Sequence, residues 1–354
     1  MTASVKVGVL NDMADLSDLD DGAAGPGDIT DWLEREIGIL RKSGRLTAPV
    51  EFVHAYGLGL PSGTAEAVER AYRQLADAGV CLIVGPAIGD NALIATPLAA
   101  EANDDWAGAE RARSRYMFHH QVGSHEDESL VMARHMASLG ARRLGVVYDI
   151  SPIGTRHLKY LQDEAGVLGI KIVATEGLSP MADDAQEQVH KVLGEKPDGF
   201  VYLGLGLSAS PAATALAHAG WEGPKIMNTA GLRGYHGDFA RACDGWFYID
   251  MHSDSNRTLQ AVMAELGAPP QRALAAAKGH DIGRLVAEGL ARAKDFSREG
   301  VRVGLEQVKW LPAAEGEEGT LLGFGIQDRG ALKGRYLVVR QWLDGQSVEV
   351  SSLN

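Results

Sequence analysis

Residues 79–103, GVCLIVGPAIGDNALIATPLAAEAN, decide the fold of this 354-residue chain. The apolar run 81–84 is short, uninterrupted and bounded by turn residues, which predicts a parallel strand covered on both faces. Gly85 and Pro86 form a turn, and a helical pattern starts directly after it, near Asn91. Backbone N–H groups in the first turn of a helix have no partner within the helix, so they are free to meet a ligand oxygen. The stretch therefore predicts a strand and a helix with a candidate binding loop between them.

The same alternation of strand and helix continues to about residue 300, which is typical of α/β proteins with parallel sheets. A second series of these units begins near His120, so the two halves of the chain are expected to form separate lobes. After an acidic loop at 315–318, a final strand at 336–342 is expected to rejoin the sheets. The expected strands are 5–10, 50–55, 81–84, 144–148, 171–175, 199–203, 225–228 and 245–249, and the expected helices are 64–78, 127–139, 155–168, 184–193, 211–219 and 273–293.

Composition limits the classes of partner. Hydrophobic residues make up 45% of the chain and the formal net charge is −13. An acidic balance argues against nucleic acid, because phosphate binding needs a concentrated basic surface. No apolar run approaches the roughly 18 to 20 residues that cross a bilayer, so no membrane insertion is expected. A small-molecule ligand is the partner that this composition favours.

The start of the chain leaves two compartments open. Met1 leads at once into an apolar strand, without the basic region, apolar region and cleavage site of a signal peptide. Either the protein is cytoplasmic, or an export signal has been removed. The two cysteines, Cys81 and Cys243, are expected to be buried free thiols and do not decide between these compartments.

Two patterns resemble one known family. The first is Gly85-Pro86 followed by Ala95-Thr96-Pro97 and Ala99-Ala100, and the second is the tail 328–342, DRGALKGRYLVVRQW. Both resemble the type I periplasmic binding proteins that serve Leu/Ile/Val-type ABC importers. The resemblance implies two Rossmann-like lobes with parallel central sheets, joined by a three-segment hinge. The implied lobes are 1–119 plus 252–327 and 122–249 plus 331–354, with hinges near 119–122, 249–252 and 327–331.

The resemblance also implies a ligand site in the cleft between the lobes, built from loops of both. Trp106 is interpreted as a flat wall beside the ligand, although an ordinary core tryptophan is the alternative. Ile88, Ile153 and Leu207 are expected to complete the apolar part of the site. The ligand-binding residues assigned in this way are Asp12, Met13, Ile88, Gly89, Asp90, Trp106, Gly108, His120, Ser151, Ile153, Leu207, Thr229, Ala230 and His280.

Three positions depart from the amino-acid binders of that family. Gly89 stands where a serine is common, Ile153 where a tyrosine is common, and Ala230 where an acid pairs with the substrate ammonium. A buried ammonium without a carboxylate costs several kcal/mol. We therefore expect an aromatic or hydroxylated carboxylic acid as ligand, and not a standard branched-chain amino acid. Asp12 and Asp90 are the alternative acids that leave this exclusion incomplete.

Other chemistry finds weaker support in the sequence. Residues 204–209, GLGLSA, fit a dinucleotide-binding turn, but no acid follows about 20 residues later, so a packing turn and no cofactor are expected. His119, His120 and His125 with the acids 126–128 match no zinc spacing; the region is interpreted as a helix start capped by Ser124, and no metal is expected. The chain has no nucleophile elbow and no phosphate loop, so it is not expected to be an enzyme.

The sequence thus predicts the solute-binding protein of an ABC importer, periplasmic or extracellular, with permease subunits as partners and a monomeric or homodimeric state. The alternative is a cytoplasmic small-molecule sensor of the amide-sensor type on the same fold. The sequence does not identify the ligand.

Overall fold

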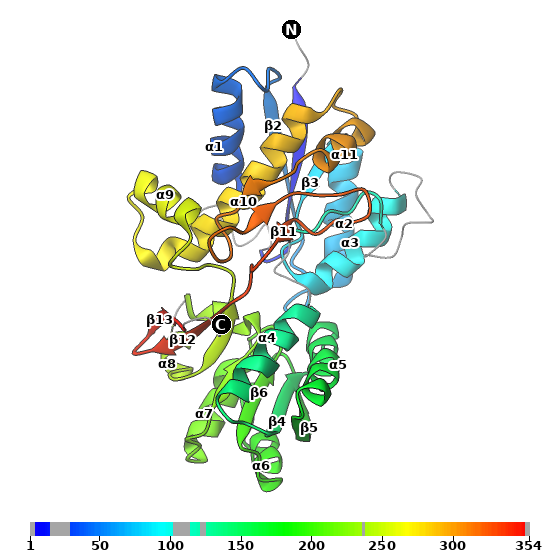
Figure 1. The fold of residues 1–354 in the computed structure, drawn as a ribbon. Coiled ribbons are helices and arrows are strands. Elements are labelled where there is room, and N and C mark those ends of the chain that lie inside the picture. Colours follow the sequence, from blue (N-terminus) through cyan, green and yellow to red (C-terminus); the bar gives the residue numbers. More distant parts are fainter. Residues whose placement is uncertain (1–3, 15–28, 102–113, 121–124, 236–237, 351–354) are drawn as a thin grey trace. The chain divides into compact units, whose positions relative to one another are not determined.

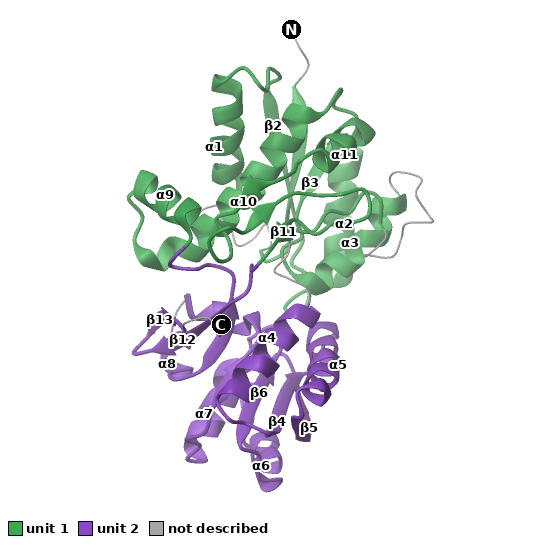
Figure 2. Cartoon of the chain, in the orientation of Figure 1, with its two compact units in different colours: residues 1–121, 256–334 green, residues 122–255, 335–354 purple. Residues whose placement is uncertain are grey.

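The computed structural model describes residues 4–14, 29–101, 114–120, 125–235 and 238–350. They form two compact units (Figures 1 and 2): unit 1 comprises residues 1–121 and 256–334, and unit 2 comprises 122–255 and 335–354. Each unit is an α/β structure around a parallel sheet, and the chain passes between the units at 121/122, 255/256 and 334/335. The expected fold class, two Rossmann-like lobes joined by three chain segments, is confirmed.

The sheet of unit 1 has the order β2-β1-β3 in the described part of the chain, and all its pairs are parallel. Val7, at the centre of the sheet, pairs with Phe52 on one side and with Leu82 on the other. The strands are β1 (Val5–Asn11), β2 (Val50–Tyr56) and β3 (Leu82–Val84).

Helices cover both faces of this sheet, with α2 and α3 on one side and α1 and α10 on the other (Figure 1). The α2 and α3 side buries Leu10 and Ala55 against Leu75 and Ala99. On the other side α1 and α10 approach closely, because Gly279 leaves room for the indole of Trp32. The helices of unit 1 are α1 (Ile29–Lys42), α2 (Ala65–Asp77), α3 (Gly89–Glu101), α9 (Arg257–Leu266), α10 (Ala273–Arg292) and α11 (Arg298–Glu306).

A small antiparallel sheet ends unit 1 and places one loop against α10. It consists of β9 (Leu311–Pro312), β10 (Leu321–Leu322) and β11 (Leu332–Lys333). The β9–β10 connection lies against α10, where Asp281 accepts a hydrogen bond of 2.8 Å from the Ala314 amide. A parallel bridge between His119 and Gly330 ties the first chain segment to the same region.

Unit 2 contains a larger sheet, whose order in the described residues is β13-β12-β8-β7-β6-β4-β5. Strands β4 to β8 are parallel, and β12 and β13 add an antiparallel edge from the end of the chain. The strands are β4 (Arg143–Asp149), β5 (Lys171–Leu178), β6 (Gly199–Leu203), β7 (Lys225–Met227), β8 (Phe247–Asp250), β12 (Val338–Leu343) and β13 (Gln346–Glu349).

Two apolar layers hold the helices of unit 2 against its sheet. On one face Val192 of α6 and Leu216 of α7 pack with Phe200, Tyr202 and Trp246. On the other face α4 and α5 contribute Met132, Met136, Leu161 and Ala165. The helices are α4 (His125–Ser138), α5 (Pro152–Val167), α6 (Gln186–Gly194), α7 (Ala209–His218) and α8 (Phe239–Ala242). Among the helices that the structure describes, none is both long and apolar enough to cross a membrane.

Strand β3 is less covered than its sequence suggests. We expected a strand buried on both faces, but Leu82, Ile83 and Val84 are all half-buried, and so is Cys81. In the described residues β3 is the edge strand, and a cavity of 80 Å³ lies against Cys81, Leu82 and Ile83. Both cysteines are free thiols as expected, but only Cys243 is buried.

Candidate functional site

In open α/β sheets ligands bind at the carboxyl ends of the strands, so the candidate residues of each unit lie at these ends. In unit 1 the connections that follow β1 and β3 are joined by one acidic side chain. Asp12 directly follows β1 and is 1% exposed. Its Oδ1 accepts a hydrogen bond of 2.8 Å from the Ala87 amide, and its Oδ2 accepts one of 3.0 Å from the Ile88 amide.

The Asp12 carboxylate is therefore committed to the protein's own loop. The side-chain amide of Asn91 also donates to Oδ2 at 2.8 Å, while the Asn91 Oδ1 accepts from the Leu60 amide. These bonds fix the turn after β3, and α3 begins at Gly89, two residues before its expected start. The interpretation of Asp12 as a spare acid for a ligand ammonium finds no support here, because donors of the loop already occupy both oxygens.

Asn11, the last residue of β1, offers a donor instead. Its side-chain Nδ2 is buried and makes no hydrogen bond to any described residue. Of the other predicted residues in this region, Met13 is 68% exposed, Ile88 and Gly89 are half-buried, and Asp90 is 5% exposed. Asn11 is not among the predicted site residues, and its unpaired side-chain amide is what makes it a candidate.

His120 and His280 belong to a second group of unit 1 side chains. His120 Nε2 lies 2.6 Å from a carboxylate oxygen of Glu315, and His280 Nδ1 lies 3.0 Å from Oδ1 of Asp281. Burial raises the pKa of the Glu315 carboxyl, the His120 imidazole opposes that rise, and the charge of Asp281 adds to it. Both histidines were predicted as ligand contacts, and their acidic partners were not.

In unit 2, the β6–α7 turn is anchored by Asp149, the last residue of β4. Asp149 is fully buried, and its Oδ1 accepts from the hydroxyls of Tyr202 at 2.8 Å and Ser208 at 2.5 Å. Its Oδ2 accepts from the Leu205 amide at 2.8 Å. Burial raises the pKa of Asp149, although these three hydrogen bonds oppose the rise. The side chain of Asn228 holds the same turn by bonding both the amide and the carbonyl of Gly204.

A buried acid also holds the end of β7. Glu128, in the first turn of α4, accepts hydrogen bonds of 3.1 Å from both the amide and the hydroxyl of Thr229. The Nε2 of His157 lies 3.2 Å from the same oxygen, and the Nδ1 of His157 faces the Ile153 carbonyl at 2.9 Å. Burial alone raises the pKa of Glu128, but the imidazoles of His157 and His125 and the Thr229 amide bring it below its usual value.

These bonds connect the predicted residues of unit 2. Ser151 caps α5 by accepting from the Gly154 amide at 3.1 Å, so that helix begins earlier than expected. Ile153 and Ala230 are 7% and 3% exposed, whereas Leu207 is half-buried. Ile153 and Thr229 thus belong to one buried network with Glu128 and His157, while Ser151 caps α5.

Sequence reasoning missed one cation near these turns. Arg233 lies in the 3-10 turn that follows β7, and its side chain runs beside Gly206. Within the described part of the chain the Arg233 guanidinium has no hydrogen bond or ion pair, and only the charge of the Tyr202 hydroxyl acts on it. The Arg233 side chain is exposed to solvent, and desolvation by its neighbours lowers the pKa of the guanidinium. No motif singled this residue out, and its only sequence signal is a basic residue shortly after a strand end.

Two predicted residues, Trp106 and Gly108, lie outside the described residues, as does the predicted cap Ser124. The structure groups the others within their own units: Asp12 with Ile88, Gly89 and Asp90, and Ile153 with Thr229. Three acids hold the connections at the strand ends. Asp12, Asp149 and Glu128 each accept a hydrogen bond from at least one backbone amide of the chain. Such acids shape binding loops.

Two α/β units with preorganised loops at the carboxyl ends of their strands, linked by three chain segments, define the class of two-lobed ligand-binding proteins. A family model described as periplasmic binding protein matches residues 5–339. The chain belongs to this family, and the expected resemblance is confirmed.

Solved structures share the fold at low sequence identity. A type 1 periplasmic binding protein from Bordetella pertussis is 15% identical with a TM-score of 0.79, over 98% of this chain and 100% of that one. The leucine binding protein LivK from Thermotoga maritima is 16% identical with a TM-score of 0.77, over 99% of each chain. The protein Rp1789 from Rhodopseudomonas palustris is 17% identical with a TM-score of 0.75, over 99% and 100%. None of the curated proteins compared with the chain matches it.

Proposed function

We propose that this protein is the solute-binding component of an ABC importer and that its ligand is a small organic acid, aromatic or hydroxylated. The family and the shared fold support the role of a ligand-binding protein without catalysis. Its partners would be the two permease subunits. Its place would be outside the cytoplasmic membrane, as for the Rhodopseudomonas palustris neighbour described as an extracellular ligand-binding receptor.

One observation carries the proposed ligand class: at the carboxyl ends of the strands the acids are occupied, while two donors are free. Asp12 and Glu128 already accept hydrogen bonds from the chain, and Ala230 supplies no acid. Asn11 Nδ2 and the guanidinium of Arg233 have no partner among the described residues. Free donors and a cation suit a carboxylate or hydroxyl group, and an ammonium would meet no free carboxylate among these residues.

The roles of the remaining predicted contacts follow from this proposal. We propose that Met13, Ile88, Ile153 and Leu207 contact the apolar part of the ligand. Helix N-termini at Gly89 and at the Ser151 cap would present backbone amides to its polar part. Asp90, Trp106, Gly108, His120, His280 and Thr229 remain predicted contacts.

A thermal-shift screen tests the function, because a ligand that binds only the native state raises the unfolding temperature by mass action. The panel comprises aromatic carboxylates, hydroxylated acids, aliphatic amides and the standard amino acids, each at millimolar concentration. We expect a shift with at least one acid and none with leucine. A shift with leucine contradicts the proposed ligand class. A shift confined to amides replaces the importer role with that of a cytoplasmic amide sensor.

A further inference from the structure

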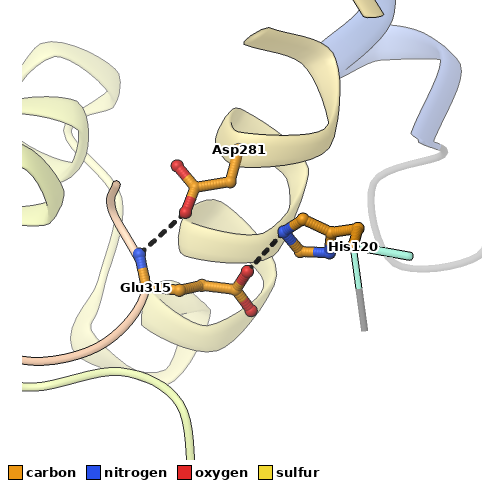
Figure 3. A group of neighbouring side chains, drawn as sticks. All are labelled: His120, Asp281 and Glu315. Atoms are coloured by element: carbon orange, nitrogen blue, oxygen red, sulfur yellow. Dashed lines mark hydrogen bonds and ion pairs between the residues drawn. The ribbon is translucent and has the colours of Figure 1, made fainter. Parts of the chain in front are cut away.

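Three side chains of unit 1 converge although they come from distant parts of the sequence (Figure 3). His120 ends the segment 114–120, Asp281 lies on α10, and Glu315 lies in the loop between β9 and β10. Their candidate ligand atoms all lie within 4.8 Å of one another. Asp281 and Glu315 are both fully buried, so the cluster places two carboxylates and one imidazole in a site with little access to water.

Among the described residues, the carboxylate of Glu315 has an ion pair with His120 and feels the more weakly acting charge of Lys278. Neither of its oxygens makes a hydrogen bond with a residue that the structure describes, and the buried Nε2 of His120 makes none with them either. Nε2 and the nearer oxygen are 2.6 Å apart, which is close enough for an ion pair but lacks the orientation of a hydrogen bond. A buried carboxylate without hydrogen bonds is costly unless a cation compensates it.

Asp281, in contrast, is fixed in place. Its Oδ1 accepts from the Ala314 amide at 2.8 Å and lies 3.0 Å from Nδ1 of His280. Its Oδ2 accepts from the Glu315 amide at 2.9 Å, which leaves one lone pair of that oxygen available. Outer contacts of this kind orient ligands in metal sites.

We propose that His120 Nε2, Asp281 Oδ2 and the Glu315 carboxylate bind one divalent transition-metal ion, with Zn²⁺ as the best match. A dication neutralises both buried carboxylates and compensates the Glu315 oxygens, which accept no hydrogen bond from a described residue. An imidazole ligand favours Zn²⁺ and its neighbours over Mg²⁺ and Ca²⁺, which prefer oxygen atoms alone. Bonds of about 2.0–2.2 Å place the ligand atoms of a tetrahedral ion roughly 3.3–3.6 Å apart, so His120 and Glu315 must separate from 2.6 Å to admit the ion between them. The Glu315 side chain can rotate into this arrangement, because no hydrogen bond from a described residue holds it.

A second buried pair of a histidine and an acid differs from this cluster, because its carboxylate is fully hydrogen-bonded. In unit 2 His252 Nδ1 lies 3.0 Å from Oδ1 of Asp250. The Met251 amide donates to the same Oδ1, and the hydroxyl of Tyr235 donates to Oδ2 at 2.8 Å. That aspartate is satisfied by the protein, so the pair needs no ion and serves as the matched control.

The test measures Zn²⁺ binding to the full chain, without a histidine tag and after treatment with EDTA, by titration calorimetry. Wild type is expected to bind one Zn²⁺ per chain, with Mg²⁺ and Ca²⁺ giving no saturable heat. His120→Asn and Glu315→Gln should each weaken Zn²⁺ binding by at least about tenfold, the loss that even an outer-shell partner causes in metal sites. The control His252→Asn should bind Zn²⁺ as wild type does.

Circular dichroism of the metal-free variants shows whether they are folded, and X-ray absorption at the zinc edge of wild type gives a readout that needs no variant. One imidazole nitrogen together with carboxylate oxygens supports the site. No saturable Zn²⁺ binding, equal binding by all variants, or a zinc shell without that donor set overturns it. Stabilisation by ethylammonium in place of Zn²⁺ also overturns it and assigns the cluster to an organic amine. None of these results depends on the proposed organic acid.

Discussion

Thr229 donates both its backbone amide and its hydroxyl to the same carboxylate oxygen of Glu128, at 3.1 Å in each case. Since His157 faces that oxygen as well, one fully buried acid ties the end of β7 to α4 and α5. The connection at the end of β7, where a ligand contact is predicted, is thus positioned by a charge that never reaches solvent. The stability of unit 2 should depend on that charge.

We expect Glu128→Gln to lower the free energy of unfolding at pH 7 by about 1–3 kcal/mol, the usual cost of weakening the hydrogen bonds of buried donors, here those of Thr229. The pKa of Glu128 is lowered in the folded protein. Its contribution is therefore present above the unfolded value of about 4.3 and is lost as the pH falls through the folded value. Urea denaturation between pH 7 and pH 3 should show a shallower acid loss in the variant than in wild type.

The exposed Glu187, which pairs with Lys191 on α6, provides the control. Glu187→Gln should leave the free energy of unfolding nearly unchanged, because exposed ion pairs contribute little. Equal effects of the two substitutions would contradict the role of the buried pair.

Glycine is needed at position 204 because Asp149, which anchors the β6–α7 turn, lies against it. A methyl group at this position would overlap the carboxylate of Asp149, which three hydrogen bonds hold in place. We expect Gly204→Ala to lower the free energy of unfolding by about 1–3 kcal/mol, as overpacking does elsewhere. Gly166→Ala, in the open surroundings of α5, should instead be neutral or stabilise by up to about 1 kcal/mol. Thermal denaturation of both variants distinguishes a steric demand from a general effect of glycine.

Arg233 is the residue on which the proposed ligand class depends most directly. Once the screen has identified an acid, Arg233→Gln should weaken its binding by roughly tenfold to a hundredfold, the value of a charge-assisted hydrogen bond. Arg241→Gln should leave the affinity unchanged, since Arg241 is exposed and pairs with Asp238. Calorimetric titration of the acid measures both. An unchanged affinity for Arg233→Gln would remove this residue from the site.

The expectations that held are those that depend on local pattern. The run Gly199–Leu203 is apolar throughout, and it is the fully buried strand β6. The helix expected at 64–78 is α2 (Ala65–Asp77), and Thr64 caps it by accepting from the Ala67 amide. Patterns of this kind specify which segments become strands and helices, because side-chain spacing alone determines which face of an element is apolar.

The burial expected for β3 was wrong, because burial depends on which elements lie beside a strand. Leu82, Ile83 and Val84 are as apolar as a central strand, but β3 has only one paired neighbour in the described residues and stays half-buried. The ligand contact predicted for Asp12 stays a prediction, but amides of the loop at 87–88 already bind its oxygens. Whether a polar group is free for a ligand depends on which donors the fold brings to it, and those donors lie elsewhere in the chain.

The sequence by itself determined the α/β class, because the class follows from periodicity, and a resemblance in two motifs indicated the family. It did not indicate the helices α1, α9 and α11. Only the tertiary structure decided which charged side chains are buried and which partners they have. Glu315 begins an acidic run that suggests a solvated loop, yet it is fully buried beside His120 and Asp281. Burial is a property of the assembled chain, because the atoms that exclude water from Glu315 come from segments that only folding brings together.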